Sequence, residues 1–216
     1  MARQAQDDGI GEICATPHIR HDHDVRIPEL PGRVAALAAA VREAGCAARI
    51  LPGAEVAATA LDGLDDHELA ALSLGGSRRW VLLEPAPGPL DDRFETAVDR
   101  LGGRGFRALV AHPERHLAPD LTGRLRRLVT KGALVQATAA FLSDETVRPG
   151  MLVLARAGVV HVLGSDAHSS RGGRPVALAG ALEVLGTIEP TASHLDWVAR
   201  EAPQAIVRGE ELTPPF

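Results

Sequence analysis

Histidine, aspartate and glutamate recur in this sequence at the ends of short apolar runs, and together they could bind metal ions. Thr16-Pro-His18 follows one such run, and Glu55 and Glu84 follow two others. The most distinctive groups are His112-Pro-Glu-Arg115 and Ser165-Asp-Ala-His168. Imidazole nitrogens and carboxylate oxygens without a thiolate suit a manganese, iron or zinc centre that activates water, rather than a structural zinc site.

Each group alone also fits an ordinary structural role. His18 could cap a loop, Glu55 could be a solvated loop carboxylate, and Glu84 before a proline could simply end a strand. Asp166 and His168 are stronger candidates, because an aspartate and a histidine two residues apart can aim at one ion as they leave a strand. The metal hypothesis therefore depends on all these groups meeting at one place.

Strands and helices alternate along the chain, and this alternation would bring the groups together. The predicted strands are apolar runs, as expected where both faces of a parallel sheet are covered. They span residues 10–15, 49–53, 80–83, 107–111, 134–137 and 159–164. The predicted helices span residues 31–44, 65–73, 91–100, 121–131, 150–157, 176–185 and 194–207, the last with a break at Pro203.

We therefore predict one α/β domain over residues 1–216 with six βα units, arranged as a barrel-like closure or as an open doubly wound sheet. In both arrangements the active site forms at the C-terminal ends of the strands. Five of the six predicted strands end at, or are followed directly by, His, Asp or Glu. No GxGxxG or GxxxxGKS segment opens a helix, which argues against a dinucleotide or Walker-type site.

Composition excludes several classes of protein. The net charge of −5 gives no basic footprint for nucleic acid. No apolar run reaches the roughly 18–20 residues of a membrane helix, and the N-terminus has no apolar signal segment, so we expect a cytoplasmic protein without membrane insertion. Two cysteines, Cys14 and Cys46, make no disulfide framework and match no catalytic motif.

The remaining histidines are weaker candidates. His21 and His23 form a His-x-His pair in a polar segment that we interpret as a solvated loop. We expect His161 to be packed inside a strand. Surface positions are predicted for three others: His67, His116 and His194.

Several motifs, in order and at similar spacings, resemble the capsule-associated bacterial tyrosine phosphatases of the polymerase and histidinol phosphatase (PHP) superfamily. The resemblance covers essentially the whole chain. Its motifs are Ala15-Thr-Pro-His18, Leu51-Pro-Gly-Ala-Glu55, Leu82-Leu-Glu84, Ala111-His-Pro-Glu-Arg115, Gly132-Ala-Leu-Val-Gln-Ala-Thr138 and Ser165-Asp-Ala-His168.

The resemblance implies a distorted (β/α)7 barrel with a cluster of up to three divalent metal ions, often manganese, with iron or zinc as alternatives. Arg115 matches a family arginine near the phosphate, and Arg171 or Arg174 would supply a second one at a shifted spacing. A metal-bound hydroxide would attack the phosphorus of phosphotyrosine, while the arginines hold the phosphoryl oxygens. By motif match the metal ligands would be His18, Glu55, Glu84, His112, Asp166 and His168.

The implied substrate is a phosphotyrosine protein, and the usual partner is an autophosphorylating bacterial tyrosine kinase that controls exopolysaccharide and capsule assembly. One alternative is a PHP phosphatase acting on a small molecule such as histidinol phosphate or a nucleotide. Another is a non-catalytic, truncated remnant of the barrel. Hydrolysis of phosphotyrosyl peptides, of small esters or of neither would separate the three.

The chain departs from the family pattern at its start. Family members begin with a strand that carries Asp-x-His-x-His, whereas Met1-Ala-Arg-Gln-Ala5 matches the helix after that strand. We therefore expect six strands rather than seven. Three explanations are open: a start codon placed too late, which we favour; a genuine truncation with an incomplete cluster; or substitution by His21-Asp-His23, which we disfavour because it belongs to a different loop.

Overall fold

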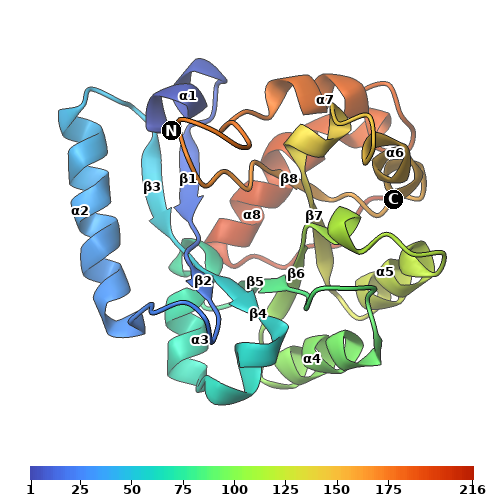
Figure 1. The fold of residues 1–216 in the computed structure, drawn as a ribbon, viewed down its shortest axis with the longest axis horizontal. Coiled ribbons are helices and arrows are strands. Elements are labelled where there is room, and N and C mark those ends of the chain that lie inside the picture. Colours follow the sequence, from blue (N-terminus) through green and yellow to red (C-terminus); the bar gives the residue numbers. More distant parts are fainter.

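The structure, a computed structural model, describes residues 1–216 and contains eight strands that all pair in parallel (Figure 1). The strands are β1 (Glu12–Ala15), β2 (His18–Ile19), β3 (Arg49–Pro52), β4 (Glu55–Ala57), β5 (Trp80–Glu84), β6 (Arg107–Ala111), β7 (Leu134–Thr138) and β8 (Val162–Gly164). The α-helices are α1 (Ala2–Asp7), α2 (Leu30–Glu43), α3 (Asp66–Leu72), α4 (Asp92–Gly103), α5 (Leu121–Thr130), α6 (Arg148–Arg156), α7 (Ala179–Leu185) and α8 (Ala202–Arg208).

Six of the eight strands, β1, β3, β5, β6, β7 and β8, fall within or overlap the six predicted ranges, whereas the short strands β2 and β4 lie beyond the predicted strands 10–15 and 49–53. Pro17 has no N–H to donate and separates β1 from β2. Gly53 separates β3 from β4 at a close approach, where an added Cβ would lie 3.2 Å from Leu74 Cδ2. Strands β1 and β3 form a two-stranded sheet, and the other six form the main sheet.

The strand order of the main sheet decides between the two predicted architectures. The order is β2-β4-β5-β6-β7-β8, so every strand lies beside the next one in the chain. A doubly wound sheet would reverse its order at a switch point, whereas a sequential order curls the sheet toward a barrel. The prediction of a barrel-like α/β fold with six strands is confirmed. Strands β2 and β8 form the two edges and do not pair with each other.

Alternation along the strands gives the sheet two different faces. Val81 and Leu83 point to the helix layer and belong to a core of 35 buried residues. Trp80 and Leu82 point the other way, into a smaller cluster of nine buried residues that includes Ile206 of α8. Glu84 continues the second series, which places its carboxylate on the concave face of the sheet at the C-terminal edge.

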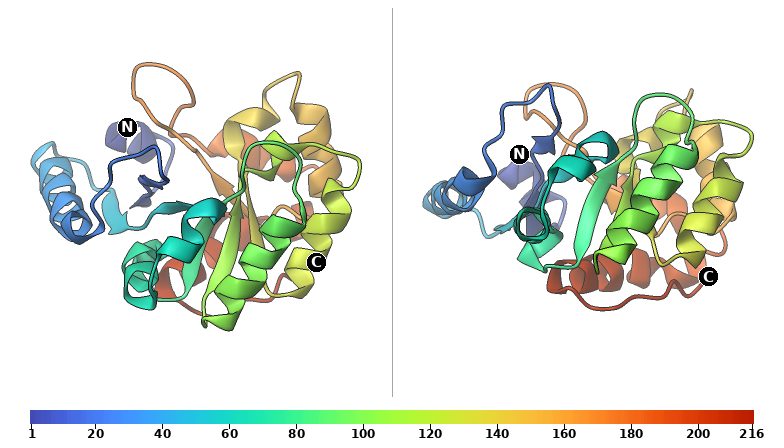
Figure 2. Two further views of the ribbon diagram at one scale, coloured as in Figure 1. Left: turned by 60° about the horizontal axis from the view of Figure 1, so that its bottom comes forward. Right: turned by 90° about the horizontal axis from the view of Figure 1, so that it is seen from below.

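Helix α8 closes the concave face at the opposite end. The right-hand view of Figure 2 shows α8, in red, at the bottom, while the loops that follow the strands lie at the top. The helix packs closely against a turn at Gly75, whose φ of 68° is in the left-handed region. A Cβ there would overlap the carbonyl oxygen of Val207, so the contact requires glycine.

Helix boundaries follow ordinary capping chemistry. Asp65 and Glu68 form a capping box at the start of α3, and Asp91 accepts hydrogen bonds from the N–H groups of Arg93 and Phe94 in α4. The predicted break at Pro203 is not found: a π-helical turn over Trp197–Glu201 runs directly into α8, and Pro203 lies in its first turn, where a missing N–H costs little. None of the helices combines the length and the apolar character that a membrane crossing requires.

His161 is packed inside the core as predicted, and its protonation state makes the stability of the fold depend on pH. Its side chain is fully buried, its Nδ1 accepts a hydrogen bond from the Val135 N–H at 3.0 Å, and its ring stacks on Phe216. Burial lowers the pKa of His161 from 6.5 to about 4. The folded protein therefore keeps this ring neutral over a range in which the unfolded chain binds a proton.

We expect this ring to make the protein acid-sensitive. Because the folded pKa lies below the unfolded one, the stabilisation is complete above pH 6.5 and is lost as the pH falls toward about 4. Between pH 7 and pH 4.5 the wild type should lose about 2–3 kcal/mol more unfolding free energy than His161→Asn. Asparagine can accept the same bond but does not titrate. Urea titrations at both pH values measure this difference, and parallel losses in the two proteins would contradict it.

Candidate metal centre

Strained backbone at two strand ends turns side chains toward the C-terminal edge of the main sheet. His112 follows β6 with φ 32°, and Asp166 lies just beyond β8 with φ 47°. Positive φ is uncommon for residues other than glycine and costs about 1–3 kcal/mol, so it persists where the surroundings enforce it, often at functional sites. Both residues were predicted as metal ligands from the sequence.

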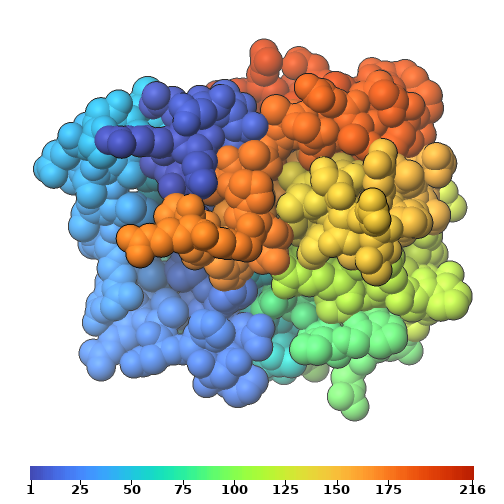
Figure 3. Space-filling model, turned by 45° about the horizontal axis from the view of Figure 1, so that its top comes forward, coloured from blue at the N-terminus to red at the C-terminus, as the bar shows by residue number.

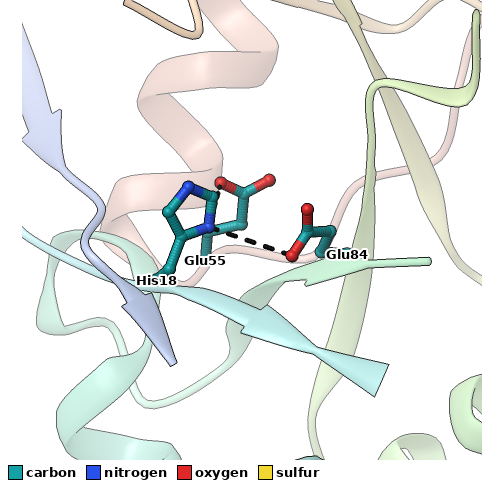
Figure 4. A group of neighbouring side chains, drawn as sticks. All are labelled: His18, Glu55 and Glu84. Carbon is teal, nitrogen blue, oxygen red and sulfur yellow. Dashed lines mark ion pairs between the residues drawn. The ribbon is translucent and has the colours of Figure 1, made fainter. Parts of the chain in front are cut away.

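Three other predicted ligands converge within a few ångströms (Figure 4). His18, Glu55 and Glu84 each offer one ligand atom, and these atoms all lie within 4.8 Å of one another. His18 Nδ1 is 3.2 Å from Glu55 Oε2 and 3.8 Å from Glu84 Oε2. His18 and Glu55 are the first residues of β2 and β4 and face each other in the sheet register, and Glu84 ends β5.

Glu55 also links this group to His112. Nε2 of His112 lies 2.7 Å from Glu55 Oε1 and 3.7 Å from Glu84 Oε1. Burial raises the pKa of Glu55, but the hydrogen bond from His112 and the charges of His112 and His18 outweigh burial and hold it below its usual range. Glu55 is therefore ionised at neutral pH and available as an anionic ligand.

The donor set fits a divalent cation. Nδ1 of His18 and Nδ1 of His112 are buried and make no hydrogen bond, although carboxylates surround the first of them. Buried polar atoms normally have a partner, and a cation held by imidazole and carboxylate groups would supply one. Oxygen and nitrogen donors without sulfur suit manganese, iron or zinc.

The loop after β8 brings the last two predicted ligands to the same place. His168 Nε2 lies 3.1 Å from His18 Nε2, although 150 positions separate the two residues. His168 Nδ1 lies 3.0 Å from the carbonyl oxygen of Asp166, a contact that orients the ring. Figure 3 shows this segment, in orange, against the blue N-terminal part of the chain, where Asp8 accepts hydrogen bonds from the N–H groups of Leu178 and Ala179.

Two of the three candidate arginines reach the centre. Arg115 forms an ion pair with Asp166, and Arg174 contacts the same carboxylate at 2.9 Å and the Asp166 carbonyl at 2.8 Å. Arg171 lies on the exposed part of the loop, and its guanidinium makes no ion pair or hydrogen bond. The structure therefore brings Arg115 and Arg174 together and leaves Arg171 apart.

The loop after β2 contributes groups that the sequence analysis disfavoured, such as His23, or did not consider, such as Arg20. The ring centroid of His23 is 5.0 Å from that of His18, and Arg20 contacts Glu84. Asp22 binds both Arg20 and His23. Interpreting this segment as a solvated loop missed these contacts, although its position directly after β2 placed it at the same edge.

His116 was predicted at the surface, and this prediction is wrong. The short helical turn from Pro113 to His116 folds inward, so that the His116 ring is 5% exposed and stacks on His112. Glu114 in the same turn is buried and accepts a hydrogen bond from the Thr138 N–H at 3.0 Å. Burial raises the pKa of Glu114 and lowers that of His116. The turn holds the backbone of His112 in place.

Comparison with known proteins identifies the family. Residues 1–204 match the family described as capsular polysaccharide synthesis, CpsB/CapC. This chain belongs to the CpsB/CapC family. The predicted resemblance to capsule-associated tyrosine phosphatases is thereby confirmed.

Relatives of the CpsB/CapC chain include proteins named for phosphatase activity. A candidate tyrosine-protein phosphatase, CapC of Staphylococcus aureus, is 25% identical over 178 residues, covering 78% of this chain and 68% of that protein. A solved structure is similar with a TM-score of 0.79 and 25% identity, covering 97% of this chain and 85% of the other. It comes from work on YwqE from Bacillus subtilis and CpsB from Streptococcus pneumoniae, described as unique metal-dependent tyrosine phosphatases.

Proposed function

We propose that this CpsB/CapC chain is a metal-dependent protein-tyrosine phosphatase that acts as a single domain. The observation that carries the proposal is the convergence of His18, Glu55 and Glu84 within 4.8 Å, next to two arginines. The main core draws residues from Ile19 to Val198, which supports a single folding unit. The similar proteins named as tyrosine phosphatases support the reaction class.

The metal would be held by six residues: His18, Glu55, Glu84, His112, Asp166 and His168. Divalent cations, when bound in such a site, supply an activated water nucleophile and positive charge for phosphoryl oxygens. Manganese is our first choice of metal, with iron and zinc as alternatives, because the donors are imidazole and carboxylate. Up to three ions per chain are proposed.

Arg115 and Arg174 would bind the phosphate. In this structure both guanidinium groups donate to Asp166, and their fork of N–H donors suits phosphoryl oxygens equally well. They come from the loops after β6 and β8, so they would hold the phosphate from one side of the centre. The phenolate of tyrosine leaves readily and needs little help from an acid.

One groove of the molecule is lined by residues of the helix-side core and begins next in sequence to Glu84. It has a volume of about 450 Å³, begins at Pro85 and continues between the loop after β4 and helix α4. It is lined in part by Thr59, Pro87 and Phe94. We propose an autophosphorylating tyrosine kinase of capsule or exopolysaccharide assembly as the physiological substrate.

The test is a comparison of substrates by the purified chain loaded with manganese. We expect hydrolysis of a phosphotyrosyl peptide, with kcat/KM at least about 100-fold above that for histidinol phosphate or a nucleotide monophosphate. A preference for the small esters would identify a small-molecule phosphatase instead. Metal-loaded protein that hydrolyses none of these esters would contradict the proposal.

A further inference from the structure

Arg20 reaches the centre from a different strand end than the two arginines that bind Asp166. It follows β2, whereas Arg115 and Arg174 follow β6 and β8. Its Nη1 lies 3.4 Å from both carboxylate oxygens of Glu84, one of the three clustered ligand candidates. The Arg20 side chain is only 28% exposed, so most of its surface is covered by the protein.

Asp22 fixes the orientation of this guanidinium. Nε and Nη2 of Arg20 donate to the two oxygens of Asp22 at 3.0 and 3.1 Å, a bidentate arrangement that defines the plane of the group. Only Nη1 is then directed at the centre, and its distance to both Glu84 oxygens is long for an ion pair. Asp22 is in turn held by His23 at 3.0 Å.

A cation at the centre would change what Nη1 can bind. The oxygens of Glu84 that face Arg20 are among those available to a metal, and a carboxylate drawn to a cation is a weaker acceptor for a neighbouring guanidinium. Asp22 would still hold Arg20 in place. An N–H donor fixed next to a dication and released from its carboxylate is a binding group for an anion on that dication.

We propose that Arg20, oriented by Asp22, is a third phosphate-binding arginine of this centre. Its role is to donate from Nη1 to a phosphoryl oxygen near Glu84, in addition to the donors of Arg115 and Arg174. The inference rests on the proposed phosphatase function and adds a substrate-binding residue to it. It also gives the segment from Arg20 to His23 a function as one wall of the phosphate site.

The experiment compares Arg20→Ala and Arg20→Lys with wild type and with the control Arg26→Ala. Arg26 is a nearby exposed arginine that pairs with Glu29 away from the centre. All proteins are loaded with manganese, and the metal content is measured in each. The affinity for inorganic phosphate is then measured by calorimetry, and KM and kcat are measured with a phosphotyrosyl peptide.

We expect Arg20→Ala to bind phosphate about 10- to 100-fold more weakly with its metal content unchanged, because a charge-assisted hydrogen bond is lost. KM should rise by a similar factor, Arg20→Lys should recover part of the affinity, and Arg26→Ala should match wild type.

Loss of metal from Arg20→Ala would overturn the inference, because Arg20 would then only support Glu84. Wild-type affinity in an active Arg20→Ala enzyme would also overturn it, while leaving the proposed function intact. If the metal-loaded wild type neither binds phosphate nor hydrolyses the peptide, both fail together.

Discussion

Glu55→Gln should lose both bound metal and phosphotyrosine hydrolysis while remaining folded. Glu55 is the carboxylate shared by His18 and His112, at 3.2 and 2.7 Å. Glutamine keeps the shape of the side chain but removes the negative charge that two imidazoles and a cation require. Because loss of groups that only orient ligands already costs about 10- to 100-fold, we expect kcat/KM to fall by more than about 100-fold.

The measurement pairs elemental analysis for manganese, iron and zinc with turnover of a phosphotyrosyl peptide. Glu95→Gln is a matched control, because Glu95 is also a shielded carboxylate, held by Arg124 and Arg127 on the helix layer. That variant should keep its metal and its rate. A Glu55→Gln protein that retained the metal content and turnover of the wild type would show that this carboxylate is no ligand.

The second large effect concerns stability rather than chemistry. Gly75→Ala should destabilise the fold by about 3 kcal/mol, because alanine is strained at a φ of 68° and its Cβ would overlap the backbone of Val207. The neighbouring atoms are backbone and Cβ of α8, which cannot move aside as a flexible side chain would. Relief therefore requires α8 to shift from its contact with Trp80 and Leu82.

Urea unfolding of the two proteins measures this cost. Gly102→Ala, within α4, is the matched control: an added Cβ there meets nothing within 4 Å. Alanine should be neutral or stabilise by about 0.5–1 kcal/mol at this helical position. Equal midpoints for Gly75→Ala and wild type would mean that α8 does not depend on this close approach.

Four strands of the main sheet, β5 to β8, could be predicted because their apolar runs are uninterrupted. Residues 107–111 match β6 at both ends, and residues 134–137 miss one residue of β7. The short strands β2 and β4 were not predicted. They span two and three residues directly after Pro17 and Gly53, and runs this short beyond a proline or a glycine give no strand signal of their own.

The general location of the centre could also be predicted, because parallel strands must end at the same edge. Glu84 lies at that edge because it ends β5, and His18 and Glu55 lie next to it because they follow β1 and β3 and begin the short strands β2 and β4. The choice between Arg171 and Arg174 could not be made, because it depends on how the loop after β8 folds back on Asp166. No periodic pattern encodes the path of such a loop.

The inward turn of His116 escaped prediction for a related reason. The four residues from Pro113 to His116 are mostly polar, which is typical of an exposed turn. In the structure the turn is covered by its neighbours, and Oε1 of Glu114 accepts a hydrogen bond from the backbone N–H of Thr138 at the end of β7. Long-range partners of this kind decide whether a polar residue is buried, and they are invisible in the local sequence.

The contact between His18 and His168 has a consequence for the order in which the protein is made. The two rings meet across 150 positions, and Arg174 lies further along the chain still. While the ribosome is synthesising the chain, the segments from β2 to β7 can already pair, because each strand needs only the one before it. Asp166, His168 and Arg174 are absent until residues 166–174 have emerged. A nascent chain thus carries most of its fold before its phosphate site is complete.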